Sequence, residues 1–193
     1  FSPADVGLDR AAARSALGYD EGCFVVGICA ALRPEKAHAD LLQVVATLGR
    51  EGLPVRCLVI GDGPERPRLE SLAERLGISR SVAITGYQMD VRSHVMACDA
   101  LVLCSHSETF SLSALESMAM GRPMVMTRIG GASEQLVDGE TGFLYEPGDL
   151  DALARAAEYV RRSFTLQKML GEYASLFEGV ARHPGGRSAA SIR

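Results

Sequence analysis

Short apolar runs alternate with helical patterns along most of this chain, and this alternation constrains the fold more than any other feature. The apolar runs predict strands at 24–30, 55–61, 81–85, 100–104, 123–127 and 142–146. The helical patterns cover 38–50, 64–76, 90–97, 111–120, 133–137, 149–162 and 165–181. Because most of the strands are apolar on both faces, helices must cover both sides of the sheet. The pattern predicts an α/β fold with a doubly wound parallel sheet of about six strands and right-handed crossovers.

Proline and glycine residues support these boundaries. Pro64 stands at a predicted helix start, where its missing N–H group leaves no helical hydrogen bond unmade. Gly77 and Gly121 follow predicted helices, where glycine readily takes the left-handed conformation that ends a helix. Pro123 opens a predicted strand, a position that tolerates the loss of one ladder bond. Turn residues and periodicity therefore indicate the same elements.

The size and charge of the chain limit what it can bind. With 193 residues, 47% of them apolar, the chain is long enough for one domain with a full core, and disorder is excluded. The longest apolar run, 23–32, is far shorter than the roughly 18 residues that indicate a membrane span. Twenty basic residues against 24 acidic ones give a net charge of −4, which argues against a nucleic-acid partner.

The cysteines and the first residues indicate the setting of the protein. None of the five cysteines forms a CxxC pair, and most lie in or beside apolar runs. This favours buried thiols in a reducing cytoplasm over disulfides or zinc ligands. No charged-then-apolar leader is visible, so we expect no secretion signal and a cytoplasmic location. The chain begins with Phe1 rather than Met, and we interpret it as a piece of a longer protein.

The segment "SHSETFSLSALESMAMGRP", residues 105–123, holds two carboxylates eight positions apart. Glu116 has a structural interpretation, because Ser113 and Glu116 have the spacing of a capping box at a helix start. Glu108 precedes the helix and follows a predicted strand, at the edge where such sheets bind ligands. Polar residues that lead into a helix start are typical of an anion site.

In such an anion site, free backbone N–H groups at the helix start would point at a phosphate. These groups belong to Phe110, Ser111 and Leu112, and the helix dipole would favour the negative charge there.

The loop after the first predicted strand, "LRPEKAH", should lie at the same edge as Glu108. Lys36 in this loop is informative because the chain has 18 Arg and only two Lys. A phosphate contact and a solvated surface charge both remain open for Lys36. The glycines of "GDGPER" (61–66) are interpreted mainly as a tight turn, since the third glycine of the dinucleotide fingerprint is absent. Those of "IGGASEQ" (129–135) would let a ligand approach the backbone closely.

The sequence offers no metal site and no nucleophilic triad. Its four histidines are scattered without the spacing of metal ligands, and no Ser-His-Asp or Cys-His arrangement can be argued. We therefore assign no metal-binding residue.

Taken in order, the motifs resemble a known enzyme family. They are "LRPEKAH", "LVIGDGPERPRLE", "ITGY", "DALVLCSHSETFSLSALESMAMGRPMV", "IGGASEQLVDGETGFLYEPGD" and "TLQKMLGEY". They resemble the C-terminal, donor-binding domain of a retaining GT-B glycosyltransferase of family 4, the glycosyl transferases group 1. The resemblance covers about residues 20–180 and implies a Rossmann-like fold, one half of a GT-B enzyme that is a hexosyltransferase-type glycosyltransferase.

The resemblance implies roles along a nucleotide-diphosphate sugar. Glu116 would hold the ribose hydroxyls. Glu108 would be the catalytic residue, near the donor sugar, and would help to orient the sugar hydroxyls. The backbone around Gly86 and Tyr87 would meet the base. Lys36 and the N–H groups at 110–112 would bind the diphosphate, where cations and N–H donors stabilise the charge that develops on the leaving group. The resemblance implies no protein nucleophile, no metal and no cofactor.

Three departures from the family pattern affect this assignment. The family usually has Gly-Arg where this chain has Ala30 and Ala31, and the missing arginine is normally a second diphosphate contact. We expect Arg33 to replace it. The family glycine after the lysine is Ala37, and the glycine after Phe110 is Ser111, whose hydroxyl would cap the helix or touch a phosphate.

The resemblance also implies a domain organisation. Residues 1–181 would form the donor-binding domain, with 1–20 derived from an interdomain linker, 165–181 as a helix that crosses back to the other half, and 182–193 as a flexible tail. The partner would be the missing N-terminal acceptor domain of the same chain. The fragment would then bind nucleotide without turnover. The full-length enzyme would associate peripherally with the inner face of the membrane.

Other functions remain open. A GT-B sugar-nucleotide epimerase shares this architecture, whereas an NAD-dependent oxidoreductase should carry an intact glycine fingerprint after its first strand. The Ala30-Ala31 departure keeps a third alternative open, a nucleotide-binding or docking module that performs no chemistry.

Overall fold

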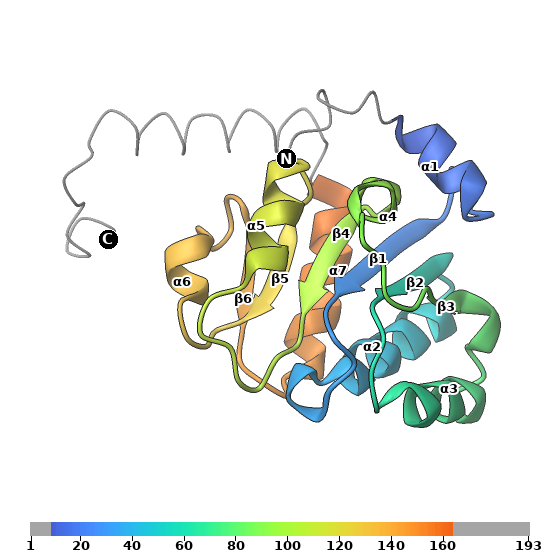
Figure 1. Cartoon of the computed structure of the whole chain (residues 1–193), viewed down its shortest axis with the longest axis horizontal. Helices are drawn as coiled ribbons and strands as arrows, with labels where there is room; N and C mark the ends of the chain where they lie inside the picture. The colour runs from blue at the N-terminus through green and yellow to red at the C-terminus, as the bar shows by residue number, and fades with distance from the viewer. Residues whose placement is uncertain (1–8, 164–193) are drawn as a thin grey trace.

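The computed structural model describes residues 9–163, which form one six-stranded sheet with helices on both faces (Figure 1). The strands are β1 (Phe24–Cys29), β2 (Val55–Ile60), β3 (Val82–Ile84), β4 (Ala100–Leu103), β5 (Met124–Thr127) and β6 (Gly142–Tyr145). Their order in the sheet is β3-β2-β1-β4-β5-β6, and every neighbouring pair is parallel. The predicted Rossmann-like α/β sheet is confirmed.

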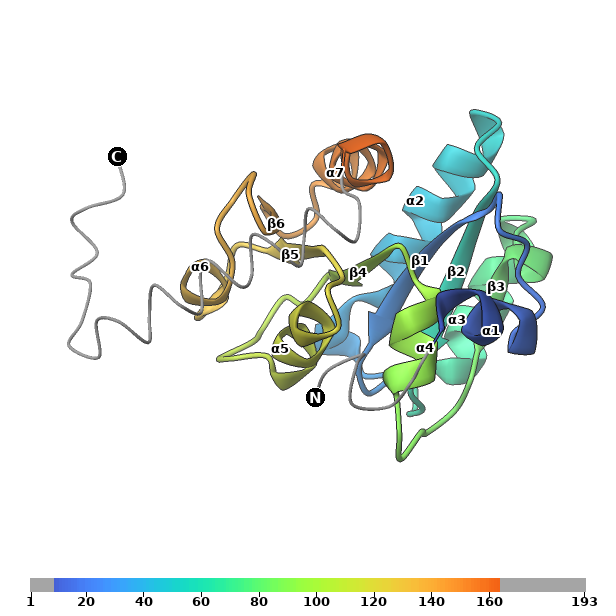
Figure 2. The ribbon, with the colours of Figure 1, turned by 90° about the horizontal axis from the view of Figure 1, so that it is seen from above.

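Helices cover the sheet on two sides. They are α1 (Arg10–Ala16), α2 (His38–Arg50), α3 (Arg66–Arg75), α4 (Arg92–Ala97), α5 (Leu112–Ala119), α6 (Ala132–Gln135) and α7 (Leu150–Ser163), with the short 3-10 turns η2 (Pro34–Lys36) and η3 (Ser79–Ser81). Seen from above, α2 and α7 lie together on one face, and α1, α4 and α5 lie on the other (Figure 2). This arrangement makes the sheet doubly wound.

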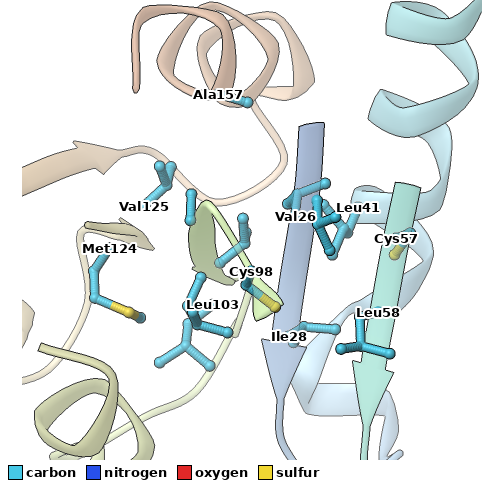
Figure 3. Packing of buried hydrophobic residues seen from close by; sticks show 14 of the residues in the cluster. Val26, Ile28, Leu41, Cys57, Leu58, Cys98, Leu103, Met124, Val125 and Ala157 are labelled. Atoms are coloured by element: carbon cyan, nitrogen blue, oxygen red, sulfur yellow. The ribbon is translucent and has the colours of Figure 1, made fainter. Parts of the chain in front are cut away.

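The core lies on both faces of the central strands, as the apolar runs predict. The side chains of Val26 and Ile28 in β1 and Leu58 in β2 are each no more than 1% exposed. Figure 3 shows Val26 beside Leu41 of α2, and Met124 and Val125 of β5 belong to the same cluster. Burial of apolar surface at about 25 cal/mol per Å² makes this layer the main stabilising element of the fold.

The structure adjusts several predicted boundaries by one or two residues. The helix expected from residue 64 begins at Arg66, with Pro67 rather than Pro64 in its first turn. Gly77 and Gly121 have φ of +72° and +67°, which confirms them as left-handed helix ends. The predicted helix at 165–181 and the tail at 182–193 lie outside the described residues.

The sequence analysis missed α1, since residues 1–20 were expected to be linker. Asp9 caps this helix by accepting a hydrogen bond from the Ala12 N–H group. The helix packs beside α4 and buries the Arg14 side chain, which is 1% exposed. A short, alanine-rich segment with arginines has no clear apolar stripe, so its burial depends on the charge partners described in the Discussion.

Candidate functional site

The two polar loops that the sequence analysis singled out, after β1 and after β4, lie at the carboxyl edge of the sheet. The arrowheads of β1 and β4 point toward this edge in Figure 1. The two strands are neighbours, but their onward connections run to opposite sides, to β2 and to β5. A switch of this kind opens a crevice outside the strand ends, where doubly wound sheets bind ligands. The loops after β1 and β4, and the start of α5, border this crevice.

An ion pair links the loops after β1 and β4. Lys36 Nζ lies 2.5 Å from Glu108 Oε2, although the residues are 72 positions apart in the chain. A backbone bond from His106 N–H to the Glu35 carbonyl, at 2.7 Å, holds the two loops together. Both side chains are about one-fifth exposed, so a ligand in the crevice can reach them. The expectation that Lys36 and Glu108 share an edge is met.

The first turn of α5 is capped by Ser111, not by Ser113. Ser111 Oγ accepts a hydrogen bond from the Ala114 N–H group at 3.2 Å, and its backbone is extended, as at a helix cap. Ser113 is already the second residue of the helix. The capping-box interpretation of Glu116 is therefore wrong, and its carboxylate is not needed to start the helix.

Only part of the expected group of free N–H donors is free. The N–H group of Ser111 donates to Oε1 of Gln135 at 3.1 Å, so the expectation that it is available to a phosphate is wrong. Within residues 9–163, the N–H groups of Phe110 and Leu112 have no acceptor. The N–H of Ser113 is in the same state, because it too lies in the first turn.

Glu116 projects from α5 toward the end of β1. Its negative charge contributes to raising the pKa of Cys29 to about 11, after the larger effect of burial on that thiol. Cys29 is the last residue of β1, so the charge of Glu116 acts at the carboxyl edge of the sheet. Glu116 is partly buried, and no salt bridge holds it among the described residues. Its carboxylate oxygens can accept hydrogen bonds from a ligand.

Two glycine pairs build the edge by allowing backbones to touch. A Cβ on Gly130, whose φ is +50°, would lie 1.9 Å from the Glu108 carbonyl oxygen. The Gly131 N–H group donates to the Thr109 carbonyl at 2.8 Å. In "GDG", a Cβ on Gly61 would lie 2.2 Å from the Ala30 carbonyl. At both pairs, two backbone segments pack closely against each other. This agrees with the tight-turn interpretation of Gly61, and it packs the Glu108 backbone against the loop that leads into α6.

Within residues 9–163, Arg33, the predicted substitute cation, makes no hydrogen bond or ion pair with Glu108 or with the start of α5. It is exposed and lines a pocket of about 140 Å³ with Glu65, Arg68 and His106, among others, whereas Glu108 lines a different, smaller cavity. Ala31, at the position of the family arginine, is exposed. In this arrangement Lys36 is the one cation that the structure places on Glu108.

Ala37 has a backbone conformation that glycine adopts more easily than alanine. Its φ of 47° and ψ of 40° are left-handed, and it is the only residue other than glycine with positive φ among residues 9–163. This conformation costs an alanine roughly 1–2 kcal/mol relative to a right-handed one. The turn that presents Lys36 is therefore retained at the expense of some stability.

The segment expected to meet the base lies two strands from β1. Gly86 is buried with φ of +74° and pairs with Gly61, while the Tyr87 side chain is 79% exposed. Since neighbouring strands are about 4.8 Å apart, the end of β3 lies roughly 10 Å from the end of β1. An elongated ligand is needed to touch both ends.

The described part of the chain has neither a metal-ligand cluster nor a helix that could span a membrane. Residues 9–163 contain no cluster of three or more His, Cys, Asp or Glu side chains able to hold a metal ion. No helix in this range has both the length and the apolar content that a membrane crossing requires.

Gln135 is the site-edge residue that sequence reasoning missed. It follows the exposed Glu134, while Gln135 itself is 6% exposed. The apolar residue after it, Leu136, is also buried. The change from polar to apolar residues in "SEQL" is the one local sign that Gln135 faces inward.

Known proteins match this fold and these motifs. The family model described as glycosyl transferases group 1 matches residues 9–177. The D-inositol 3-phosphate glycosyltransferase of Corynebacterium urealyticum is 37% identical over 185 residues, covering 90% of this chain and 43% of that protein.

Two solved structures also resemble the chain. Anabaena Alr3699/HepE in complex with UDP-glucose has a TM-score of 0.71 at 26% identity, covering 93% of this chain and 54% of that one. The C-terminal domain of the group 1 glycosyl transferase LpcC from Francisella tularensis has a TM-score of 0.74 at 22% identity, covering 93% of this chain and 94% of that domain.

The chain spans less than half the length of the curated relatives that it matches, and about the length of the isolated LpcC domain. The expected fold, one Rossmann-like half of a GT-B enzyme, is confirmed. Because the family model matches most of its length, the chain belongs to the glycosyl transferases group 1.

Proposed function

We propose that this chain is the donor-binding domain of a retaining, hexosyltransferase-type glycosyltransferase, and that it binds a nucleotide-diphosphate sugar across the carboxyl edge of its sheet. The observation that carries the proposal is the meeting of Lys36 and Glu108 beside the start of α5. A cation, a carboxylate and free N–H donors at one crevice suit a ligand with both phosphate and hydroxyl groups. The complex of Alr3699/HepE with UDP-glucose supports this ligand class.

Each group has a role along the proposed donor. Lys36 and the N–H groups of Phe110 and Leu112 bind the diphosphate, where they stabilise the negative charge that develops as the sugar–phosphate bond breaks. Glu108 orients the hydroxyls of the donor sugar. Glu116 holds the ribose, and the backbone at Gly86 and Tyr87 meets the base.

The span of the crevice fits an extended ligand. The loops after β3, β1 and β4 lie in that order along one edge, so base, ribose, diphosphate and sugar can follow the same direction. In a retaining reaction the acceptor attacks from the face that the leaving group vacates, which requires neither a protein nucleophile nor a metal. We therefore propose a metal-independent transfer, with the acceptor held by a further domain of the full-length enzyme.

Calorimetry with the 193-residue chain tests the proposal. UDP, GDP and ADP, and their glucose or mannose conjugates, are titrated in the presence of EDTA. We expect one base to give a binding signal, which Glu116→Ala abolishes and Lys36→Ala weakens by about tenfold, or roughly 1.4 kcal/mol. Arg68→Ala serves as the control, because Arg68 pairs with Glu65 on α3 and should leave binding unchanged. Binding of NAD alone, or of none of these ligands, would contradict the proposal.

A second candidate function is a nucleotide-binding or docking module without catalysis. The exposed Ala31 and the separate position of Arg33 favour it, because the diphosphate then meets only one cation. The two functions separate in a transfer assay on the full-length protein. Release of nucleotide from the donor supports the enzyme, whereas donor binding without release supports the module.

A further inference from the structure

The side chain of Gln135, at the end of α6, holds the backbone of Ser111 by two hydrogen bonds. Its Oε1 accepts from the Ser111 N–H at 3.1 Å, and its Nε2 donates to the Ser111 carbonyl at 2.7 Å. Gln135 is only 6% exposed, and both bonds are buried. A buried amide with both ends paired fixes the group it holds, because leaving either end unpaired costs its desolvation.

Ser111 passes this restraint to α5. Its Oγ caps the helix by accepting from Ala114 N–H, and its carbonyl also receives the N–H of Leu115 at 3.4 Å. The orientation of Ser111 therefore sets the direction in which the first turn of α5 points. The next two N–H groups, of Leu112 and Ser113, have no acceptor within residues 9–163. These are the groups that an anion at the helix start would meet.

The same short helix also supports the residues before Ser111. The Gly131 N–H donates to the Thr109 carbonyl, and Gly130 touches the Glu108 carbonyl without room for a side chain. These backbone contacts lie at the start of α6, and Gln135 lies at its other end. Gln135 is the one side chain of α6 with a hydrogen bond to the start of α5.

We propose that Gln135 is a positioning residue of the diphosphate site: by holding Ser111, it aims the N–H groups of Leu112 and Ser113 at the donor phosphates. Gln135 has no contact of its own with the ligand. The inference rests on the proposed function, since it assigns the diphosphate to the start of α5. It also explains why the Ser111 N–H is not itself a phosphate donor.

Gln135→Met tests the proposal, because methionine has a similar size and neither hydrogen-bonding end. UDP binding is measured by calorimetry and uridine binding by NMR titration, both with the 193-residue chain. We expect UDP to bind about tenfold more weakly and uridine to bind unchanged, because only the phosphate donors are disturbed. Amide hydrogen exchange at Ser111 should become faster. An unchanged UDP affinity, or equal losses for UDP and uridine, would overturn the inference.

Gln135→Glu gives a second readout that a purely structural role would not produce. At pH 8 the carboxylate lacks the proton that Nε2 supplies to the Ser111 carbonyl, and UDP should bind more weakly. Near pH 5 a protonated carboxyl can both donate and accept, so the ratio of variant to wild-type affinity should recover severalfold. A ratio that does not change with pH contradicts the proposal, and this variant also decides the matter if Gln135→Met does not fold.

A matched control separates positioning from loss of stability. Leu48→Ala removes a buried side chain of α2, on the other face of the sheet, and should destabilise the fold without changing UDP affinity. If Leu48→Ala weakens UDP binding as much as Gln135→Met does, the positioning role is wrong. If the wild-type chain binds none of UDP, GDP and ADP, the proposed function fails before the role of Gln135 is at issue.

Discussion

The two edges of the parallel sheet carry charged pairs in contrasting states. At the amino edge, Arg14 is 1% exposed and donates to the carbonyls of Ala97, Glu21 and Cys23 as well as to Asp99. Asp99 in turn accepts from Arg10 and from the Val25 N–H group. At the carboxyl edge, the side chains of Lys36 and Glu108 have only each other as hydrogen-bonding partners among residues 9–163.

The contrast shows how one kind of interaction serves two purposes. A buried charge whose donors are all paired stabilises the fold, and removing one partner is expensive because the other is left without compensation. A pair that solvent can reach adds little stability, because water screens it and its side chains lose freedom. Such a pair retains unused donors and acceptors, which a ligand can take up. The amino edge therefore holds α1 to the sheet, and the carboxyl edge is available for binding.

The largest expected effect tests the amino edge. Arg14→Met removes the donors to four carbonyls, those of Ala97, Asp20, Glu21 and Cys23, and leaves Asp99 with one cation fewer. We therefore expect the free energy of unfolding to fall by about 3–5 kcal/mol. Urea unfolding measures the change. Arg68→Met, which breaks an exposed pair on α3, should cost less than about 1 kcal/mol. Similar losses of unfolding free energy in the two variants would contradict the view that the buried pair at the amino edge stabilises the fold more than an exposed pair does.

A smaller effect is expected where the carboxyl edge depends on backbone contact. Gly130→Ala places a methyl group against the Glu108 carbonyl and strains a positive φ, so we expect a loss of about 2–3 kcal/mol and weaker UDP binding. The matched control is Gly139→Ala, which has a φ of +82° but no atom within 4 Å of the added Cβ. It should show only the strain of about 1 kcal/mol. Equal losses in unfolding experiments would show that the contact with Glu108 does not matter.

The smallest expected effect tests whether the Lys36–Glu108 ion pair is free to bind a ligand. Glu108→Gln should change stability by less than about 1 kcal/mol, because both side chains of the pair reach solvent. It should also raise the affinity for UDP roughly two- to fivefold, since Lys36 no longer has to leave a carboxylate to meet the phosphates. Glu158→Gln, which removes an exposed partner of Arg162 on α7, should leave UDP affinity unchanged. A loss of UDP affinity in Glu108→Gln would show that Glu108 itself contacts the nucleotide.

Sequence patterns predicted the parts of the site that depend on strand ends. Lys36 and Glu108 each follow an apolar run, and parallel strands bring their carboxyl ends to one edge, so their proximity was expected. The cap of α5 was harder to predict, because Ser111 and Ser113 both precede an apolar helix. The choice between them depends on backbone angles, and the extended conformation falls on Ser111. The predicted roles of Glu116, Gly86 and Tyr87 stay predictions until a ligand is bound.

Long-range polar contacts were not predictable from local patterns. Arg33 is three residues from Lys36, yet the turn at 34–36 directs it to a separate pocket. Gln135 meets Ser111 across 24 positions, and no local property of a glutamine specifies which backbone group it will hold. Arg14 is buried by partners from two separate segments, 20–23 and 97–99.

By itself, the sequence determined the order of strands and helices, the edge at which polar loops gather and the family to which the chain belongs. The first two follow from periodicity and from turn residues, which act over a few positions, and the family follows from the motifs and the matching family model. Only the tertiary structure decided which charges are saturated and which N–H groups remain free. The physical reason is that a hydrogen bond depends on the position of both partners, and in a folded chain those partners come from segments far apart in sequence.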